Sequence, residues 1–150
     1  MYEHRELVGD GGGAVGLHDC RTDRIDRREG TLSFAFPGGF YLLRGGKAVR
    51  TGPAHMECRI LDEDVDGISV FVYRETPSGK LLREDWSNNF AAAVNGGSFV
   101  FEFVTVYRSY QRVLFKGYVW FDTPPYHREC EIEQHTDHIL YRWDDPPTQH

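Results

Sequence analysis

Hydrophobic and polar residues alternate with a period of two along much of this chain. At 31–36 every second residue is Leu or Phe, and the residues between them are small. Because successive side chains of a strand point to opposite faces, this alternation predicts a strand with one buried face. The Pro-Gly-Gly stretch at 37–39 interrupts the pattern before apolar residues resume at 40–43, which predicts a hairpin.

Two longer apolar runs, 99–107 and 111–121, are the strongest strand candidates. Large apolar residues occupy both of their faces, which is typical of strands at the centre of a sandwich or barrel. The stretch 108–110 between them predicts a three-residue hairpin loop. Counting back from that loop places Glu102 opposite Lys116 on one face and the phenylalanines on the other.

One segment, 85–95, has a helical pattern. Trp86, Phe90 and Val94 recur at intervals of four residues, and two glycines follow as a C-terminal stop. Asp85 stands before them as a suitable N-cap. The pattern therefore predicts a short helix, with a loop as the competing interpretation.

Turn residues separate the remaining apolar runs at the spacing of antiparallel all-β domains. We predict an all-β, mainly antiparallel fold of about nine strands with one short helix, arranged as a sandwich or a partly closed barrel. Residues 1–150 are expected to form a single β domain whose ends, 1–15 and 144–150, are loosely ordered. The further strands are predicted at 55–61, 68–74, 129–133 and 138–143.

The composition adds a strong aromatic bias, with 10 Phe, 8 Tyr and 3 Trp, and aromatic residues favour strands. The net charge of −6 repels a phosphate backbone, so we expect no nucleic-acid partner. The arginines of 21–28 alternate with acidic residues, which is typical of a solvated surface.

The N-terminus and the cysteines bear on the compartment. No apolar stretch typical of a secretory signal follows the charged N-terminus, and no run approaches the roughly 18 apolar residues of a membrane span. Cys20, Cys58 and Cys130 are an odd set that makes no disulfide framework, and we interpret them as small buried side chains. We therefore expect a reduced, cytoplasmic protein that does not enter a membrane.

Two patterns that resemble metal sites lack essential ligands. The stretch 62–67 has the D-x-D-x-D-G start of a calcium loop, but the bidentate glutamate of the twelfth position is missing, so we interpret it as an acidic hairpin turn. His55 and Cys58 are three residues apart, as are His127 and Cys130. On a strand such pairs point to opposite faces, so neither chelates one ion and we expect no metal site.

The glycines at 11, 13 and 16 have the G-x-G-x-x-G spacing of a dinucleotide-binding loop. The strand, tight turn and helix that make this spacing bind a pyrophosphate are absent from the surrounding sequence. We therefore predict no cofactor.

Histidines and acidic residues supply candidates for general acid–base chemistry, although no nucleophile motif accompanies them. If they converge in a pocket of several hundred Å³, they favour a small-molecule-binding protein or a hydrolase-type enzyme with a His/Asp-lined barrel mouth. The candidate catalytic residues are His18, Asp19, His127 and His135.

Aromatic residues near arginines have the composition of protein-interface hot spots, although aromatic residues also dominate cores. Because no catalytic motif is present, the sequence favours a non-enzymatic binding or protein-interaction module, whose partner is another protein or a second copy. Whether the chain is an enzyme stays open at this point. The candidate binding residues are Trp86, Tyr107, Arg108, Tyr110, Arg112, Tyr118 and Trp120.

Overall fold

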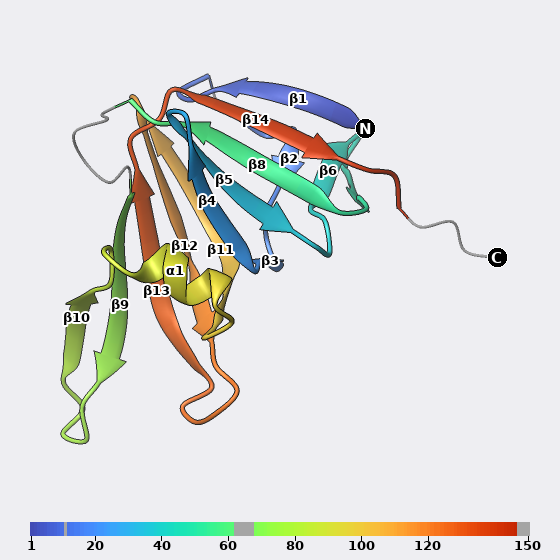
Figure 1. Cartoon of the computed structure of the whole chain (residues 1–150). Helices are drawn as coiled ribbons and strands as arrows, with labels where there is room; N and C mark the ends of the chain where they lie inside the picture. The colour runs from blue at the N-terminus through green and yellow to red at the C-terminus, as the bar shows by residue number, and fades with distance from the viewer. Residues whose placement is uncertain (11, 62–67, 147–150) are drawn as a thin grey trace.

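Two β-sheets pack face to face in this protein (Figure 1). The structure, a computed structural model, describes all residues except 11, 62–67 and 147–150. In the described part of the chain there are fourteen strands and one short helix, and the strands pair antiparallel. The predicted all-β class is confirmed, and the sheets form a sandwich that does not close into a barrel.

A five-stranded sheet in the order β1-β14-β8-β5-β4 forms one layer. In β5 the Leu and Phe side chains of the alternating pattern are buried, as predicted. The strands of this layer are β1 (Tyr2–Leu7), β14 (His138–Trp143), β8 (Ala54–Arg59), β5 (Thr31–Phe36) and β4 (Arg24–Arg28).

A six-stranded sheet in the order β10-β9-β13-β12-β11-β3 forms the other layer. The two long apolar runs became β11 and β12, which lie side by side inside this sheet, as predicted. Its strands are β10 (Leu81–Asp85), β9 (Ile68–Glu75), β13 (His127–Gln134), β12 (Arg112–Trp120), β11 (Val100–Ser109) and β3 (Cys20–Thr22).

Phenylalanines from the two layers meet in the core. Phe34 of β5 packs edge to face on Phe103 of β11 and Phe115 of β12, with ring centroids 5.9 and 5.8 Å apart. Phe36 lies 5.3 Å from Phe103 by the same measure. All four rings are fully buried. Such contacts between large apolar rings dominate core burial and hold the two layers together.

The predicted hairpin across 37–39 is wrong. β5 belongs to the five-stranded sheet, whereas β6 (Tyr41–Arg44) pairs with β2 (Val15–Gly16) and β7 (Lys47–Arg50) in a separate three-stranded sheet. The Phe40 amide donates to Thr51 Oγ1 (3.1 Å), and the Phe40 carbonyl accepts from the Thr51 amide (2.9 Å). These bonds direct the chain toward Thr51 instead of back along β5.

The helix α1 (Phe90–Asn95) is shorter than the segment predicted for it. Asp85 ends β10, and its carboxylate accepts hydrogen bonds from the Ser87 amide (2.9 Å) and hydroxyl (2.6 Å). An aspartate bonded to the backbone two residues on forms a turn, which competes with helix formation. The helix therefore begins only at Phe90.

α1 also covers the edge strand β4. The Asn95 side chain accepts a hydrogen bond from the Ile25 amide and donates one to the Ile25 carbonyl, both at 2.8 Å. One amide side chain thus replaces a neighbouring strand at the edge of the five-stranded sheet. Covering an edge in this way limits unwanted pairing with other chains.

The predicted register between β11 and β12 is also wrong. The strands pair up to Ser109 and Arg112, so the loop has two residues, and Glu102 lies opposite Tyr118 instead of Lys116. The register shifts between Phe103 and Thr105, where a β-bulge adds a residue to β11. The error begins at the loop, because the pairing of Ser109 with Arg112 is already three residues away from the predicted register, and the bulge takes back one of the three.

Backbone hydrogen bonds join residues of both stretches that were expected to be loosely ordered, 1–15 and 144–150; within the second stretch, 147–150 lie outside the described residues. Residues 2–7 form β1, which pairs with β14 along its whole length. Past β14, the Asp144 carbonyl accepts from the Gly52 amide at 2.8 Å. The sequence pattern gave no strand at 2–7, because β1 has few apolar residues and only its Glu6 is buried.

In the described residues there is no helix with the length and hydropathy required to cross a bilayer. The proposed calcium-loop stretch 62–67 and Gly11 lie outside the described residues. β8 and β9, on either side of that stretch, belong to different sheets, so they do not form the expected hairpin.

Candidate functional site

The outer face of the six-stranded sheet carries aromatic and charged side chains. In β12 and β13 the buried residues Gly117, Val119 and Cys130 point toward the core, so their neighbours point outward. Tyr118 on β12 is directly opposite Glu129 on β13. The strand alternation therefore places an aromatic ring beside a carboxylate on the exposed face.

Two hollows lie next to each other on this face. The smaller has a volume of about 150 Å³ and extends to Thr105 on β11, and the larger has a volume of about 800 Å³ and extends to Leu81 on β10. Tyr73, Tyr118 and Glu129 line both of them. We call the two hollows together the outer groove.

The position of Tyr73 follows from the pairing of β9 and β13. Cys130 lies opposite Val72, so the next residues along the two antiparallel strands, Tyr73 and Glu129, are neighbours on the outer face. Glu129 therefore lies between a tyrosine on each adjoining strand.

His127 and Trp120 support one side of Tyr118. The His127 ring lies 5.4 Å from the Tyr118 ring and 4.9 Å from the Trp120 ring, measured between centroids. The Arg21 guanidinium lies over Trp120, 5.0 Å from its ring centroid. Trp120 is thus in contact with both Arg21 and His127, and this packing supports Tyr118 in the wall of the groove.

Charged pairs leave two carboxylates of the groove without a cation. Lys116 Nζ lies 3.6 Å from Glu131 Oε1. Among the described residues, by contrast, no cationic side chain lies within ion-pair distance of Glu75 or Glu129, and both are exposed. Lys116, Arg74 and Arg128 also line the groove, but each of them is paired with a glutamate, Lys116 with Glu131 and the two arginines with Glu84. The lining of the outer groove is therefore aromatic and of mixed charge, and its unpaired charges are the carboxylates of Glu75 and Glu129 among the residues that the structure describes.

The loop between β12 and β13 forms one end of the groove. Pro125 lines the larger hollow, and the next residue, Tyr126, is 54% exposed with a φ of 68°. A bulky residue at positive φ is strained, and such strain clusters at functional sites. Hydrogen bonds between Phe121 and Tyr126 (2.7 Å) and between Tyr126 and Thr123 (2.9 Å) hold the loop in this shape.

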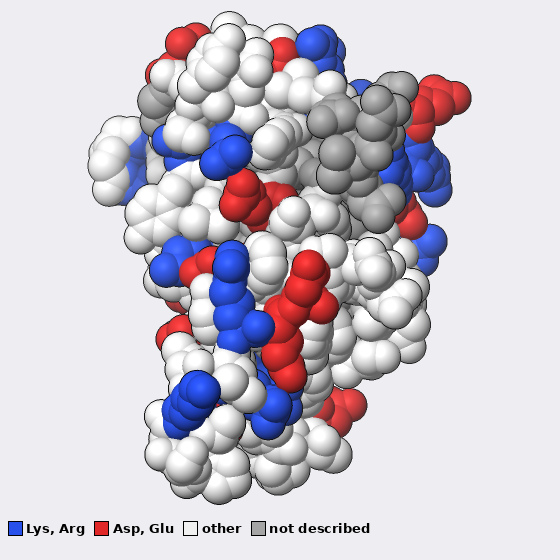
Figure 2. All heavy atoms as spheres, turned by 90° about the vertical axis from the view of Figure 1, so that its left-hand side faces the viewer, with Lys and Arg blue, Asp and Glu red and all other residues white. Residues whose placement is uncertain are grey.

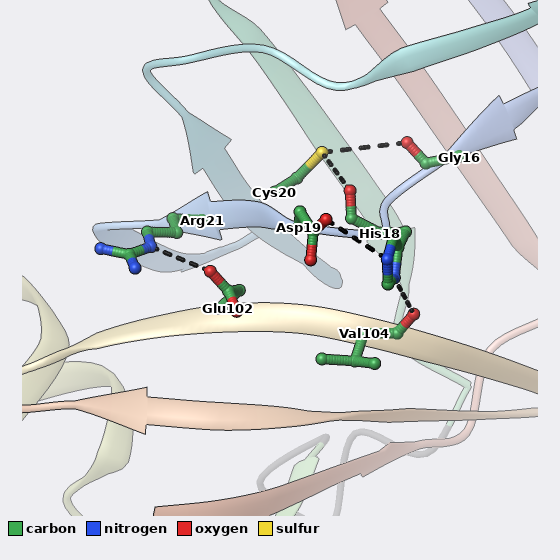
Figure 3. Close-up of polar contacts among 7 residues, drawn as sticks. All are labelled: Gly16, His18, Asp19, Cys20, Arg21, Glu102 and Val104. Atoms are coloured by element: carbon green, nitrogen blue, oxygen red, sulfur yellow. Dashed lines mark hydrogen bonds and ion pairs between the residues drawn. The ribbon is translucent and has the colours of Figure 1, made fainter. Parts of the chain in front are cut away.

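His18 and Asp19, two of the catalytic candidates, lie beside the bulge of β11 (Figure 3). His18 Nδ1 is 3.1 Å from the Val104 carbonyl oxygen, and His18 Nε2 is 3.3 Å from Asp19 Oδ2. A catalytic histidine needs one nitrogen for its orienting carboxylate and the other for the nucleophile. Here a backbone carbonyl occupies the second nitrogen, so the pair has no position for a nucleophile.

The cysteines are buried free thiols, which confirms their interpretation as small buried side chains. Burial raises the pKa of the Cys20 thiol to about 11, and its sulfur contacts the carbonyl oxygens of Gly16 and His18 (Figure 3). Burial also raises the pKa of Cys58 and Cys130. Because the thiolate is the nucleophile, these cysteines are not activated for catalysis.

The other two catalytic candidates lie far apart. His127 begins β13 beside Trp120, whereas His135 follows the other end of β13, with its Nε2 3.3 Å from Arg112 Nη2. Eight residues of extended strand separate them by roughly 25 Å. The structure therefore does not bring His127 and His135 together in one pocket.

The binding candidates divide between several places. Tyr107 and Tyr118 line the groove, and Trp120 is beside it. Trp86 instead packs on Phe99, with ring centroids 5.6 Å apart, next to α1. The remaining candidates are Arg108, which is bonded to buried Glu6, and Tyr110 and Arg112 at the β11–β12 turn.

Sequence reasoning missed Tyr73, Glu129 and Leu81 as groove residues. The alternation in 68–75 places Tyr73 on the face away from Val72, which is a usable signal. The order of the strands, however, puts β9 beside β13 across more than fifty residues of sequence, and no local pattern gives that neighbour.

Among the described residues, no three His, Cys, Asp or Glu side chains gather as ligands for a metal ion. Comparison with protein-family models, with curated proteins and with solved structures found no match to the chain. The geometry of the outer groove is therefore the basis on which a function is inferred.

Proposed function

We propose that this chain is a non-enzymatic binding module that holds an extended segment of a partner protein in the outer groove. The observation that carries the proposal is the meeting of two hollows at Tyr73, Tyr118 and Glu129 on an exposed sheet face. Tyrosine is enriched at interface hot spots because its ring offers apolar area and its hydroxyl a hydrogen bond.

The dimensions of the groove favour an extended polypeptide. It runs from β11 to β10 across five adjacent strands, which at the usual strand spacing is roughly 19 Å. That length matches about six residues of extended chain. The edge strand β10 is a poorer docking site, since charged residues occupy its second half, Arg83 to Asp85. Figure 2 shows acidic and basic side chains next to each other on the side of the molecule that carries β9 and β10.

The enzyme alternative receives less support. His127 and His135 lie at opposite ends of β13, so these two catalytic candidates share no pocket. Both ring nitrogens of His18 already have a polar neighbour, which leaves no position for a nucleophile. The three free thiols favour a reducing compartment, so we place the module in the cytoplasm.

Selection from a random peptide library tests this function. The purified chain and its Tyr118→Ala and Tyr110→Ala variants are each panned, and enriched peptides are measured by calorimetry. Tyr110 is the matched control, because it is 86% exposed at the turn outside the groove. We expect a common peptide family that binds one to one, retains its affinity for Tyr110→Ala and loses roughly tenfold or more for Tyr118→Ala.

Unfolding curves that match the wild type establish that Tyr118→Ala is folded. If no peptide family is enriched, or if the enriched peptides bind Tyr118→Ala and Tyr73→Ala as tightly as the wild type, the groove is not the binding site.

A further inference from the structure

Resting on the function proposed above, we propose that the bound segment carries a lysine or arginine whose cation lies between Tyr73 and Tyr118 against the carboxylate of Glu129. The two hollows meet at these three residues, so this is the one position that an occupant of either hollow contacts. The proposal identifies the groove as a cation-recognising site.

Glu129 differs from the two other outward-facing glutamates of β13, each of which is paired with a cation. Glu131 lies 3.6 Å from Lys116, and Glu133 lies 3.2 Å from Arg112. Glu129 points to the same face but has no cation within ion-pair distance among the described residues. Carboxylates at interfaces are matched by opposite charge on the partner, so this one is available to a cation from outside.

The arginines near Glu129 are bound to another carboxylate. Arg74 and Arg128 both line the larger hollow, yet both bind Glu84, at 3.2 and 3.6 Å. The Arg128 guanidinium also lies over the Trp86 ring, 6.0 Å from its centroid. These contacts occupy the cations that are best placed to neutralise Glu129.

Tyrosines lie on the strands on either side of Glu129. A cation within about 6 Å of an aromatic ring is attracted by the negative charge of its face. A lysine or arginine also has a long apolar stem that packs along rings while its head meets a carboxylate. The net charge of −6 steers a cationic segment toward the chain at low salt.

Nuclear magnetic resonance on the labelled full chain tests the proposal. The probes are Nα-acetyl-lysine amide and Nα-acetyl-norleucine amide, which differ by the cationic head. We expect the lysine probe to shift the amide resonances of Tyr73, Tyr118 and Glu129 saturably, and the norleucine probe to leave them unchanged. Glu129→Gln should weaken the lysine probe roughly tenfold, since a charge-assisted contact is lost.

Glu133→Gln is the matched control, because this glutamate lies on the same strand and face but outside both hollows. It should leave binding of the lysine probe unchanged. Equal shifts from both probes, or equal binding by Glu129→Gln and the wild type, would overturn the cation proposal.

The library selection separates this proposal from the function on which it rests. Selected peptides that bind in the groove should lose roughly tenfold in affinity when their lysine or arginine is replaced by glutamine. Groove-binding peptides without a cationic residue would refute the cation and leave the peptide-binding function intact. If neither peptides nor probes bind in the groove, both proposals fail.

Discussion

Replacing Glu6 by glutamine should destabilise the fold strongly, because Glu6 is half of a buried ion pair. Its carboxylate accepts from Arg108 Nε at 2.7 Å, from Arg108 Nη2 at 3.1 Å and from the Tyr141 hydroxyl at 3.1 Å. The Glu6 and Arg108 side chains are 6% and 18% exposed. The pair joins β1 of one sheet to β11 of the other.

The magnitude follows from what Glu6→Gln leaves behind. Removing one charge of a buried pair costs roughly 3–5 kcal/mol, because the other charge stays buried without compensation. The partial exposure of Arg108 places the expected loss near the lower limit, about 3 kcal/mol. Tyr141→Phe removes one hydrogen bond and should cost about 1 kcal/mol.

Urea unfolding, followed by the fluorescence of the tryptophans, gives these free energies. The control is Glu3→Gln, which changes an exposed pair on the same strand, 3.7 Å from Arg142, and should cost less than about 0.5 kcal/mol. The double variant Glu6→Leu/Arg108→Met removes both charges and should be more stable than either single charge removal. A loss below about 0.5 kcal/mol for Glu6→Gln would refute the reasoning.

Three further outcomes are expected. Gly117→Ala should lower the free energy of unfolding by about 1–3 kcal/mol, since its Cβ would overlap the Glu102 carbonyl oxygen and lie 3.1 Å from Phe101 Cζ. Gly16→Ala is the control, because its Cβ would make only ordinary contacts with Leu43. Equal stability of the two variants would contradict this expectation. Asn95→Ala should lower the free energy of unfolding by about 2 kcal/mol in the same assay, because the amide and carbonyl of buried Ile25 lose their hydrogen-bond partner. Asn89→Ala is the control, since the Asn89 side chain makes no capping bond. A loss for Asn95→Ala no larger than that for Asn89→Ala would argue against this role. Alkylation of Cys20 at pH 8 should be roughly two orders of magnitude slower in the native protein than in the unfolded chain, because burial raises the pKa of its thiol to about 11. Titration of the unfolded chain should find three thiols. Fast labelling of Cys20 in the native protein would count against its burial.

Local patterns predicted much of the fold. The alternation in 31–36 and the two long apolar runs gave strands whose buried faces are those observed, because periodicity depends only on neighbouring residues. Phe101 also approaches Gly117, as the register argument expected, although Phe103 is the residue directly opposite. The faces of these strands were therefore correct while their alignment was not.

Two features that were not predicted depended on distant parts of the chain, whereas the register error began locally, at the turn where Ser109 and Arg112 are the last pair. The bulge in β11 lies where β3 pairs with the other side of that strand: the Phe103 carbonyl accepts from Asp19 and the Val104 carbonyl faces His18. The strand β1 was not predicted because it has no apolar pattern. Buried Glu6, through its bond to Arg108, holds this strand against the sandwich. In both cases the stabilising partner is about a hundred residues away in the sequence.

The candidate site was predictable only in part. Tyr107 and Tyr118 were found because they lie in the central hairpin, where aromatic residues cluster visibly. Tyr73 and Glu129 required the order of β9, β13 and β12, which is a property of the whole sheet. Residue type thus indicated the kind of surface, and the topology determined which residues form it.

The proposed function requires the outer groove to be the binding site. The most direct test is to map, by the amide resonances of the labelled chain, where a library-selected peptide binds. We predict that the largest shifts of amide resonances fall on β9, β12 and β13, centred on Tyr73, Tyr118 and Glu129, and that Tyr118→Ala removes them together with the binding. Shifts that centre on α1 or on the five-stranded sheet, and that persist in Tyr118→Ala, would contradict the proposed function.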